Sequence, residues 1–329
     1  MLLILVLSGC SNSTKTTDKS LSSIQVTDFR GKQIGFNRHP ARIVCLIESA
    51  LSGFYMLHAE NNIVGVSSNI YEGDVFTQYA ALDGRIKNKT LPAPGNWDFI
   101  SIENVVALKP DLVVMWASQT ESIETIEAKG IPVYAVMLAS IADLYKEISD
   151  LGTITGTEKR ADSLIQYTKT QVSAFSSSLK KTAVEKQKVY FMWSQGPLET
   201  SGTKSTVNEL IELAGANNAC TSPDEHIVVN LEKVIEWNPD VIVMWYDANK
   251  SPDDIMNLSG WNNINAVKNK RVYELPSAFM CDLWTLKFQY AVKLLHTWCY
   301  PSASNDINLD SEKSDMLKML YGLKGKNIR

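Results

Sequence analysis

Residues 102–116, IENVVALKPDLVVMW, decide the fold, because they recur without gaps at residues 231–245 as LEKVIEWNPDVIVMW. The identical pairs are Glu103/Glu232, Val105/Val234, Pro110/Pro239, Asp111/Asp240, Val114/Val243, Met115/Met244 and Trp116/Trp245. Each copy predicts a short helix that stops before its proline, then a Pro-Asp turn and one strand. The runs LVVMW and VIVMW are typical of strands covered on both faces, as in a parallel sheet. We therefore expect two similar lobes.

Other apolar runs predict further strands around each copy of the repeat. They lie at 41–47, 62–68 and 130–137 in the first lobe, and at 188–193 and 271–276 in the second, which also has a helical pattern near 205–214. Strands that alternate with helices at this spacing predict an α/β fold with parallel sheets.

Residues 157–180 predict the connection between the lobes. Apolar or small side chains recur there at three-to-four spacing, at Ala161, Leu164, Ile165, Thr168, Val172, Phe175 and Leu179. This pattern indicates one amphipathic helix of about 24 residues and roughly 36 Å. A single long helix is expected to act as a stiff hinge.

Composition excludes several classes of function. The 329 residues are 45% hydrophobic and 21% charged, with eight Trp, as in folded domains and unlike disordered chains. The formal charge of -4, from 32 basic and 36 acidic residues, gives no basic surplus for binding nucleic acid. Four His and five Cys, with no C-x-x-C pair, exclude zinc-ribbon and ferredoxin patterns.

The first ten residues, MLLILVLSGC, resemble a bacterial lipobox, in which the signal peptide is removed and the new N-terminal cysteine, here Cys10, carries lipid. The polar stretch that follows suits a tether. An apolar end with an incidental cysteine is the alternative. Export would permit disulfides, but the surroundings of the remaining cysteines favour buried thiols without a required bridge; these are Cys45, Cys220, Cys281 and Cys299.

Enzyme signatures are absent from the sequence. It contains no G-x-S-x-G, no H-E-x-x-H and no G-x-G-x-x-G after a strand. A two-lobed metallocluster enzyme is the remaining enzymatic alternative, and Cys281 with His226 is a thin ligand set for it.

The order of segments closely resembles the helical-backbone class of ABC-transporter substrate-binding lipoproteins, over about residues 24–300. The similar segments are IQVTDFRGKQIGF, PARIVCL, IVGVSSN, the two E-x-x-x-x-x-x-P-D blocks and TSGTKSTVNELIELAGANN. That family serves uptake of iron–siderophores, haem, cobalamin and, in one branch, molybdate or tungstate. The resemblance implies two Rossmann-like lobes with parallel sheets joined by one long helix, a ligand in the cleft, no resident cofactor or metal, and delivery to a permease.

The expected organisation has six segments: a signal peptide at 1–9, a lipidated tether at 10–23, an N-terminal lobe at 24–156, a linking helix at 157–183, a C-terminal lobe at 184–300 and a tail at 301–329.

Glu103 and Glu232 occupy equivalent positions in the first turns of the two repeat helices. Carboxylates there interact favourably with the helix dipole by about 0.3–1 kcal/mol, which is a purely structural explanation. The resemblance implies a second one, since family members present one acidic residue per lobe to the permease. We expect Glu103 and Glu232 to be permease-docking contacts.

Ligands of doubly wound sheets bind beyond the carboxyl ends of the strands. This rule nominates Glu48 and Ser49, 69–71, 116–118, Trp193 and Ser194, Trp245 and Tyr246, and 277–284, while Trp97 resembles a cleft aromatic of the family. The ligand-binding residues predicted from these are Trp97, Trp193, Trp284, Tyr71, Trp245 and Tyr246, together with the cations Arg85 and Lys204. For Trp116 and Trp245, a role at the end of a buried core strand is expected slightly more than a ligand contact.

These features predict a monomeric, extracytoplasmic, lipid-anchored receptor of an ABC importer with its permease and ATPase as partners, rather than an enzyme. Large aromatics suit a metal chelate such as an iron-siderophore, haem or corrinoid. The scarcity of His and Cys indicates that a carried metal arrives inside a chelate. The alternative ligand is molybdate or tungstate, for which cationic and hydroxyl groups would dominate the site.

Overall fold

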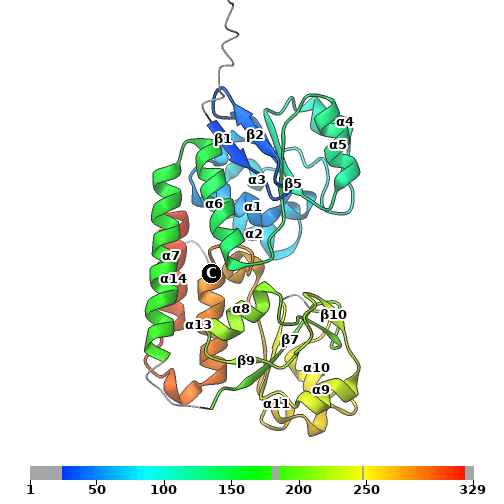
Figure 1. Ribbon diagram of the computed structural model, residues 1–329, viewed down its shortest axis with the longest axis vertical. Coiled ribbons are helices and arrows are strands. Elements are labelled where there is room, and N and C mark those ends of the chain that lie inside the picture. The colour runs from blue at the N-terminus through cyan, green and yellow to red at the C-terminus, as the bar shows by residue number, and fades with distance from the viewer. Residues whose placement is uncertain (1–23, 180–184, 247, 323–329) are drawn as a thin grey trace, which may run out of the picture.

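The computed structural model describes residues 24–179, 185–246 and 248–322 (Figure 1). The predicted signal peptide, the whole predicted tether with Cys10, and the end of the predicted linking helix lie outside the described residues. No helix in the described ranges is long and apolar enough to cross a membrane.

The N-terminal lobe is a four-stranded parallel sheet with helices on both faces. Its elements are the hairpin β1 (Ile24–Thr27) and β2 (Gln33–Phe36), then β3 (Ile43–Cys45), α1 (Glu48–Met56), η1 (Glu60–Asn62), β4 (Ile63–Val66), η2 (Ser68–Tyr71), α2 (Gly73–Leu82), α3 (Gly84–Lys87), α4 (Ile102–Ala107), β5 (Leu112–Trp116), α5 (Thr120–Ala128), β6 (Val133–Val136) and α6 (Ile141–Thr155). The strand order is β4-β3-β5-β6.

The C-terminal lobe repeats this plan. Its elements are β7 (Lys188–Met192), β8 (Glu199–Thr200), α8 (Thr206–Leu213), β9 (Asn217–Asn218), β10 (Ile227–Val228), α9 (Leu231–Trp237), β11 (Val241–Met244), α10 (Pro252–Met256), η3 (Trp261–Asn263), α11 (Asn265–Lys268), β12 (Val272–Glu274) and α12 (Ala278–Cys281). The parallel strand order is β12-β11-β7-β9, and β8 pairs with β10 in a small antiparallel sheet.

The sequence repeat corresponds to α4–β5 and α9–β11. The residue before each proline, Lys109 or Asn238, has a left-handed backbone, with φ of 47° and 44°. The aspartate after each proline receives a backbone N–H from the segment that enters the neighbouring strand: Arg42 donates to Asp111 at 3.1 Å and Lys188 to Asp240 at 2.9 Å. The shared Pro-Asp pair therefore ends the helix and ties the start of the next strand to its neighbour.

Successive side chains of a strand point to opposite faces of the sheet, and both faces are buried, as the continuous apolar runs predict. In β5, Val114 packs into a core that runs through both lobes, whereas Met115 packs with α4 and α5 on the outer face. Val243 and Met244 do the same in β11.

Helix α7 (Glu158–Leu179) confirms the predicted long connecting helix. It is accompanied by α13 (Phe288–Cys299) and by α14 (Leu309–Tyr321), which follows η4 (Pro301–Ala303), so that three helices lie along one side of the molecule (Figure 1). The tail predicted as a separate segment returns to the N-terminal lobe, where Tyr321 hydrogen-bonds Ser52 of α1 at 2.6 Å. The connection is thus stiffer than one helix alone would make it.

The four cysteines in the described ranges are buried and unbridged, as expected; these are Cys45, Cys220, Cys281 and Cys299.

Candidate ligand-binding site

A cavity of about 280 Å³ lies where the two lobes meet. The described residues that line it are Leu46, Ile47, Glu48, Ser49, Ser67, Asn69, Trp97 and Trp116 from the N-terminal lobe, and Trp245, Tyr246, Asp282 and Trp284 from the C-terminal half.

The position of the cavity follows from the parallel sheets. Its lining comes at or after the carboxyl ends of β3, β4 and β5 in one lobe and of β11 and β12 in the other, with Trp97 on the loop before α4. All parallel strands of a sheet end at the same edge, and the two edges face each other across the lobe boundary. Segments that are distant in sequence thereby reach one site.

Aromatic rings form one wall of the cavity. Trp284 stacks on Trp193, with ring centroids 5.9 Å apart and planes inclined by 4°, and it contacts Trp245 at 5.3 Å. Tyr246 extends the group from Trp245 at 4.7 Å. Trp97 on the opposite lobe is 60% exposed. Its indole is free to meet a ligand that enters between the lobes.

Hydrogen bonds from two chain segments orient this wall. The Asp282 carboxylate accepts from the backbone N–H of Trp284 at 2.9 Å and fixes the turn that carries the indole. The Gln119 amide donates to the backbone carbonyls of Asn96 and Trp97, at 3.2 and 3.1 Å, and holds the loop before α4.

Two carboxyl groups, from opposite halves of the molecule, also line the cavity. Glu48 lies in the first turn of α1, and one of its oxygens accepts a hydrogen bond from Tyr79 at 2.7 Å. Asp282 is 3% exposed. Burial first and the charge of Glu48 second raise the pKa of Asp282 to about 7.

One buried cation acts on both carboxyls. Lys287 is fully buried, and its ammonium lies 5.1 Å from the ring centroid of Phe279. Burial by itself would lower the pKa of Lys287, but Tyr321, Glu48 and Asp282 outweigh burial and raise it. The ammonium therefore stays charged and compensates one of the two carboxylates.

Four of the predicted ligand-binding residues meet at this cavity: Trp97, Trp245, Tyr246 and Trp284. Trp193 lies directly behind Trp284 and lines a separate cavity of about 220 Å³. His226 also stacks on Trp193, with ring centroids 5.7 Å apart, and pairs with Glu199 at 2.6 Å. Trp193 thus supports the aromatic wall from behind.

The structure does not bring the two predicted cations to the cavity. Arg85 donates to Asp83 and to the backbone carbonyls of Glu60 and Ile63. Because Ile63 is the first residue of β4, Arg85 lies at the amino edge of the sheet, opposite the cavity. Lys204 is exposed in the loop before α8, outside the cavity lining.

Tyr71 also lies apart from the cavity lining. Its hydroxyl donates to the backbone carbonyl of Leu91 at 2.7 Å, and its ring contacts Phe76 at 6.2 Å. The preceding Asn69 is the residue of η2 that lines the cavity.

Sequence reasoning underestimated four cavity residues. Trp116 and Trp245, expected slightly more in the core, both line the cavity. Glu48 and Asp282 fell in the nominated strand-end segments, but cations alone were considered as charged candidates. The strand-end rule had nominated both positions, and keeping its acidic members in the predicted ligand-binding set would have found the pair.

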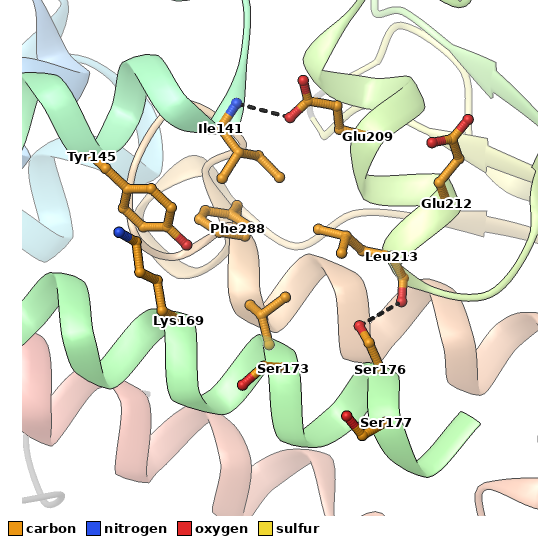
Figure 2. Close-up of a pocket in the computed structure, with 11 residues that line it drawn as sticks. Ile141, Tyr145, Lys169, Ser173, Ser176, Ser177, Glu209, Glu212, Leu213 and Phe288 are labelled. Carbon is orange, nitrogen blue, oxygen red and sulfur yellow. Dashed lines mark hydrogen bonds between the residues drawn. The ribbon is translucent and has the colours of Figure 1, made fainter. Parts of the chain in front are cut away.

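A second cavity, of about 680 Å³, lies among α6, α7, α8 and α13 (Figure 2). Glu209 of α8 accepts the backbone N–H of Ile141, the first residue of α6, at 2.9 Å, so this contact joins the two lobes beside α7. Apolar side chains such as Leu213 and Phe288 line it together with polar ones such as Lys169 and Glu212. The cavity lies beside the connecting helix α7, away from the strand ends.

Glu103 and Glu232 are exposed second residues of α4 and α9. Both helices have side-chain caps, from Ser101 and Asn230 respectively. Helices α4 and α9 lie on the side of the two lobes away from α7 (Figure 1). The two carboxylates are therefore accessible, one on each lobe.

Within the described ranges, no group of three or more His, Cys, Asp or Glu side chains is arranged to hold a metal ion.

Two parallel α/β lobes with a cavity between their strand ends define a two-lobed ligand-binding protein. The chain belongs to the periplasmic binding protein family, whose model matches residues 43–279. It is similar to an uncharacterized ABC transporter substrate-binding lipoprotein, YvrC of Bacillus subtilis, with 27% identity over 84% of this chain and 87% of that protein. It is also 27% identical to the molybdate-binding protein MolA of Haemophilus influenzae, over 90% of each chain.

Solved structures agree on the fold. Helicobacter pylori CeuE with Ni(II) bound has a TM-score of 0.79 at 21% identity, covering 92% of this chain and 97% of that chain. Family and relatives confirm an extracytoplasmic solute-binding component of an ABC transporter, which binds a small molecule for delivery to a permease and is not an enzyme.

Proposed function

We propose that this protein captures a metal chelate in the cavity between its lobes. The observation that carries the proposal is the group of aromatic rings contributed by both lobes: Trp97, Trp116, Trp245, Tyr246 and Trp284. Such rings offer flat apolar surface for the organic shell of a chelate. The cavity of about 280 Å³ is at the small end of ligand sites, which favours a compact chelate or one that extends out of the cleft.

The lining favours a chelate over molybdate or tungstate. An oxyanion site needs cationic or N–H donors aimed at the anion. The charged side chains among the described lining residues are the carboxyls of Glu48 and Asp282. Carboxylates facing an oxyanion would repel it.

Fluorescence titration tests the chelate proposal, because several tryptophans line the cavity. Ferric hydroxamates, haem, corrinoids, nickel complexes and molybdate would each be added to the purified protein. We expect saturable quenching by at least one chelate and none by molybdate. Saturable binding of molybdate without any response to chelates would contradict the proposal.

Glu103 and Glu232 are proposed as the permease contacts, and Cys10 as the lipid-carrying residue. Support for the contacts comes from the equivalent, exposed positions of the two glutamates on the two lobes.

The double variant Glu103→Ala, Glu232→Ala is expected to bind ligand normally and to lose uptake. Normal uptake by that variant would contradict docking; unchanged membrane association of a Cys10→Ala variant would contradict the anchor.

A further inference from the structure

The lining of the cavity carries an uneven balance of charge. Glu48 and Asp282 both line it, whereas Lys287, which acts on both, is fully buried among Phe279 and Tyr321. One ammonium compensates one carboxylate. Because the pKa of Asp282 is raised to about 7, the second carboxyl is about half ionised near neutrality, and its charge has no compensating cation among the described lining residues.

The other titratable groups facing Asp282 do not supply the missing charge. Glu147 of α6 is acidic, and burial raises its pKa to about 8, so it stays largely protonated near neutrality. The Cys281 thiol is fully buried, and burial raises its pKa far above neutrality. Both groups are therefore neutral around Asp282.

The hydroxyl of Ser49, also in the lining, has no hydrogen-bond partner among the described residues. Ser49 is 6% exposed. Buried hydroxyls are normally hydrogen-bonded, and leaving one unpaired costs about 1–3 kcal/mol. An unpaired hydroxyl one residue from Glu48 indicates that a ligand group completes this part of the site.

The aromatic wall favours cations, as the two carboxyls do. Ring faces carry negative charge and attract cations, most strongly when the site is desolvated. Trp97, Trp245 and Trp284 lie in the same lining as Glu48 and Asp282. A neutral ligand gains only apolar contact and neutral hydrogen bonds here, and an anion is repelled by the carboxylates.

We propose that the cavity selects a positively charged ligand, whose cationic group is bound by Glu48 and Asp282 against the tryptophan faces. This inference rests on the proposed function, because it specifies the charge of the chelate that the protein captures. The ligand supplies the positive charge that Lys287 alone does not.

Inert cobalt(III) chelates of similar size and different charge test the selection. The tripositive tris(ethylenediamine) complex, the neutral tris(glycinato) complex and the trinegative tris(oxalato) complex do not exchange their ligands, so the carboxylates cannot act by coordinating the metal. Affinities would be measured by calorimetry and tryptophan fluorescence at low salt. We expect the tripositive complex to bind at least about tenfold more tightly than the neutral one, as charge-assisted hydrogen bonds provide.

Isosteric variants then assign the effect to the two carboxyls. Glu48→Gln and Asp282→Asn keep the acceptors for Tyr79 and Trp284, and each is expected to weaken binding of the tripositive complex about tenfold or more while leaving the neutral one unchanged. Glu124→Gln, on an exposed residue of α5, is the matched control. Thermal unfolding of each variant separates loss of charge from loss of fold. Equal affinity for all three complexes, or an undiminished preference in both variants, would overturn the proposal.

Tetraethylammonium, a metal-free cation, separates this inference from the chelate function. If it binds with the same dependence on Glu48 and Asp282 while no chelate of any kind binds, charge selection stands and the chelate function fails. If chelates bind regardless of charge, the function stands and charge selection fails. If no probe binds, both are wrong.

Discussion

Replacing Glu147 by Gln should change how the stability of this protein depends on pH. Glu147 lies on α6, is 2% exposed, and its Oε1 atom has no hydrogen-bond partner among the described residues. Burial first, then the nearby Asp282 and Asp150, raise its pKa from 4.5 to about 8. The folded protein therefore keeps a proton that the unfolded chain loses above about pH 4.5.

The sign and size of the effect follow from proton linkage. Between pH 4.5 and 8 the folded state binds more protons than the unfolded state, so the free energy of unfolding falls as pH rises. Each unit of pKa difference corresponds to about 1.4 kcal/mol, and partial solvation of the ionised form reduces the total. We expect Glu147 to cost about 1–3 kcal/mol of stability between pH 5 and pH 8.

Urea unfolding followed by circular dichroism at pH 5 and pH 8 measures this cost. The Glu147→Gln variant cannot ionise at this position, so it should lose about 1–3 kcal/mol less than the parent protein over the same interval. Asp282 also titrates in this interval and interacts with Glu147, so the difference between the two proteins measures Glu147 together with this interaction. Glu124→Gln, an exposed glutamate, controls for the general effect of removing a charge. Parallel pH profiles of the parent and Glu147→Gln would refute the reasoning.

Three further predictions concern binding and stability. Trp284→Ala removes the ring that stacks on Trp193 at 5.9 Å, and should weaken chelate binding about tenfold or more in a fluorescence titration; unchanged affinity would remove Trp284 from the site. Tyr321→Phe removes the hydroxyl that hydrogen-bonds Ser52 and interacts with Lys287, and should lower the free energy of unfolding by about 1–2 kcal/mol; an unchanged urea midpoint would mean that this hydroxyl does not stabilise the contact of α14 with the N-terminal lobe. Asp240→Ala leaves the Lys188 N–H without its acceptor and should cost about 1 kcal/mol without affecting ligand affinity, which a combined unfolding and binding assay would check.

The two lobes and their connection were predictable because they depend on local patterns. A buried parallel strand reads as a continuous apolar run, and a proline marks the end of the helix before it, so residues 102–116 and 231–245 were sufficient to predict α4–β5 and α9–β11. The three-to-four spacing of 157–180 similarly predicted α7. The location of the cavity followed from the strand-end rule.

The individual members of the site were less predictable, because the identity of a side chain does not reveal its partner. Arg85 seemed suited to an anionic ligand, yet its neighbour Asp83 and two backbone carbonyls occupy its guanidinium. Trp116 ends an apolar strand pattern, and this pattern is the same whether the indole ring packs against protein or lines a cavity. Whether a side chain binds ligand or packs in the core depends on which part of the folded chain faces it.

By itself, the sequence determined a duplicated α/β architecture and a stiff connection, since these follow from the periodicity of apolar residues and from proline positions. Tertiary structure alone decided that Glu48, at the start of α1, and Asp282, after α12, share one cavity with a single buried lysine. It also decided that α14 returns to the N-terminal lobe. The physical reason is range: helix and strand signals act between neighbours in the chain, whereas charge balance and cavity shape arise between segments that meet after folding.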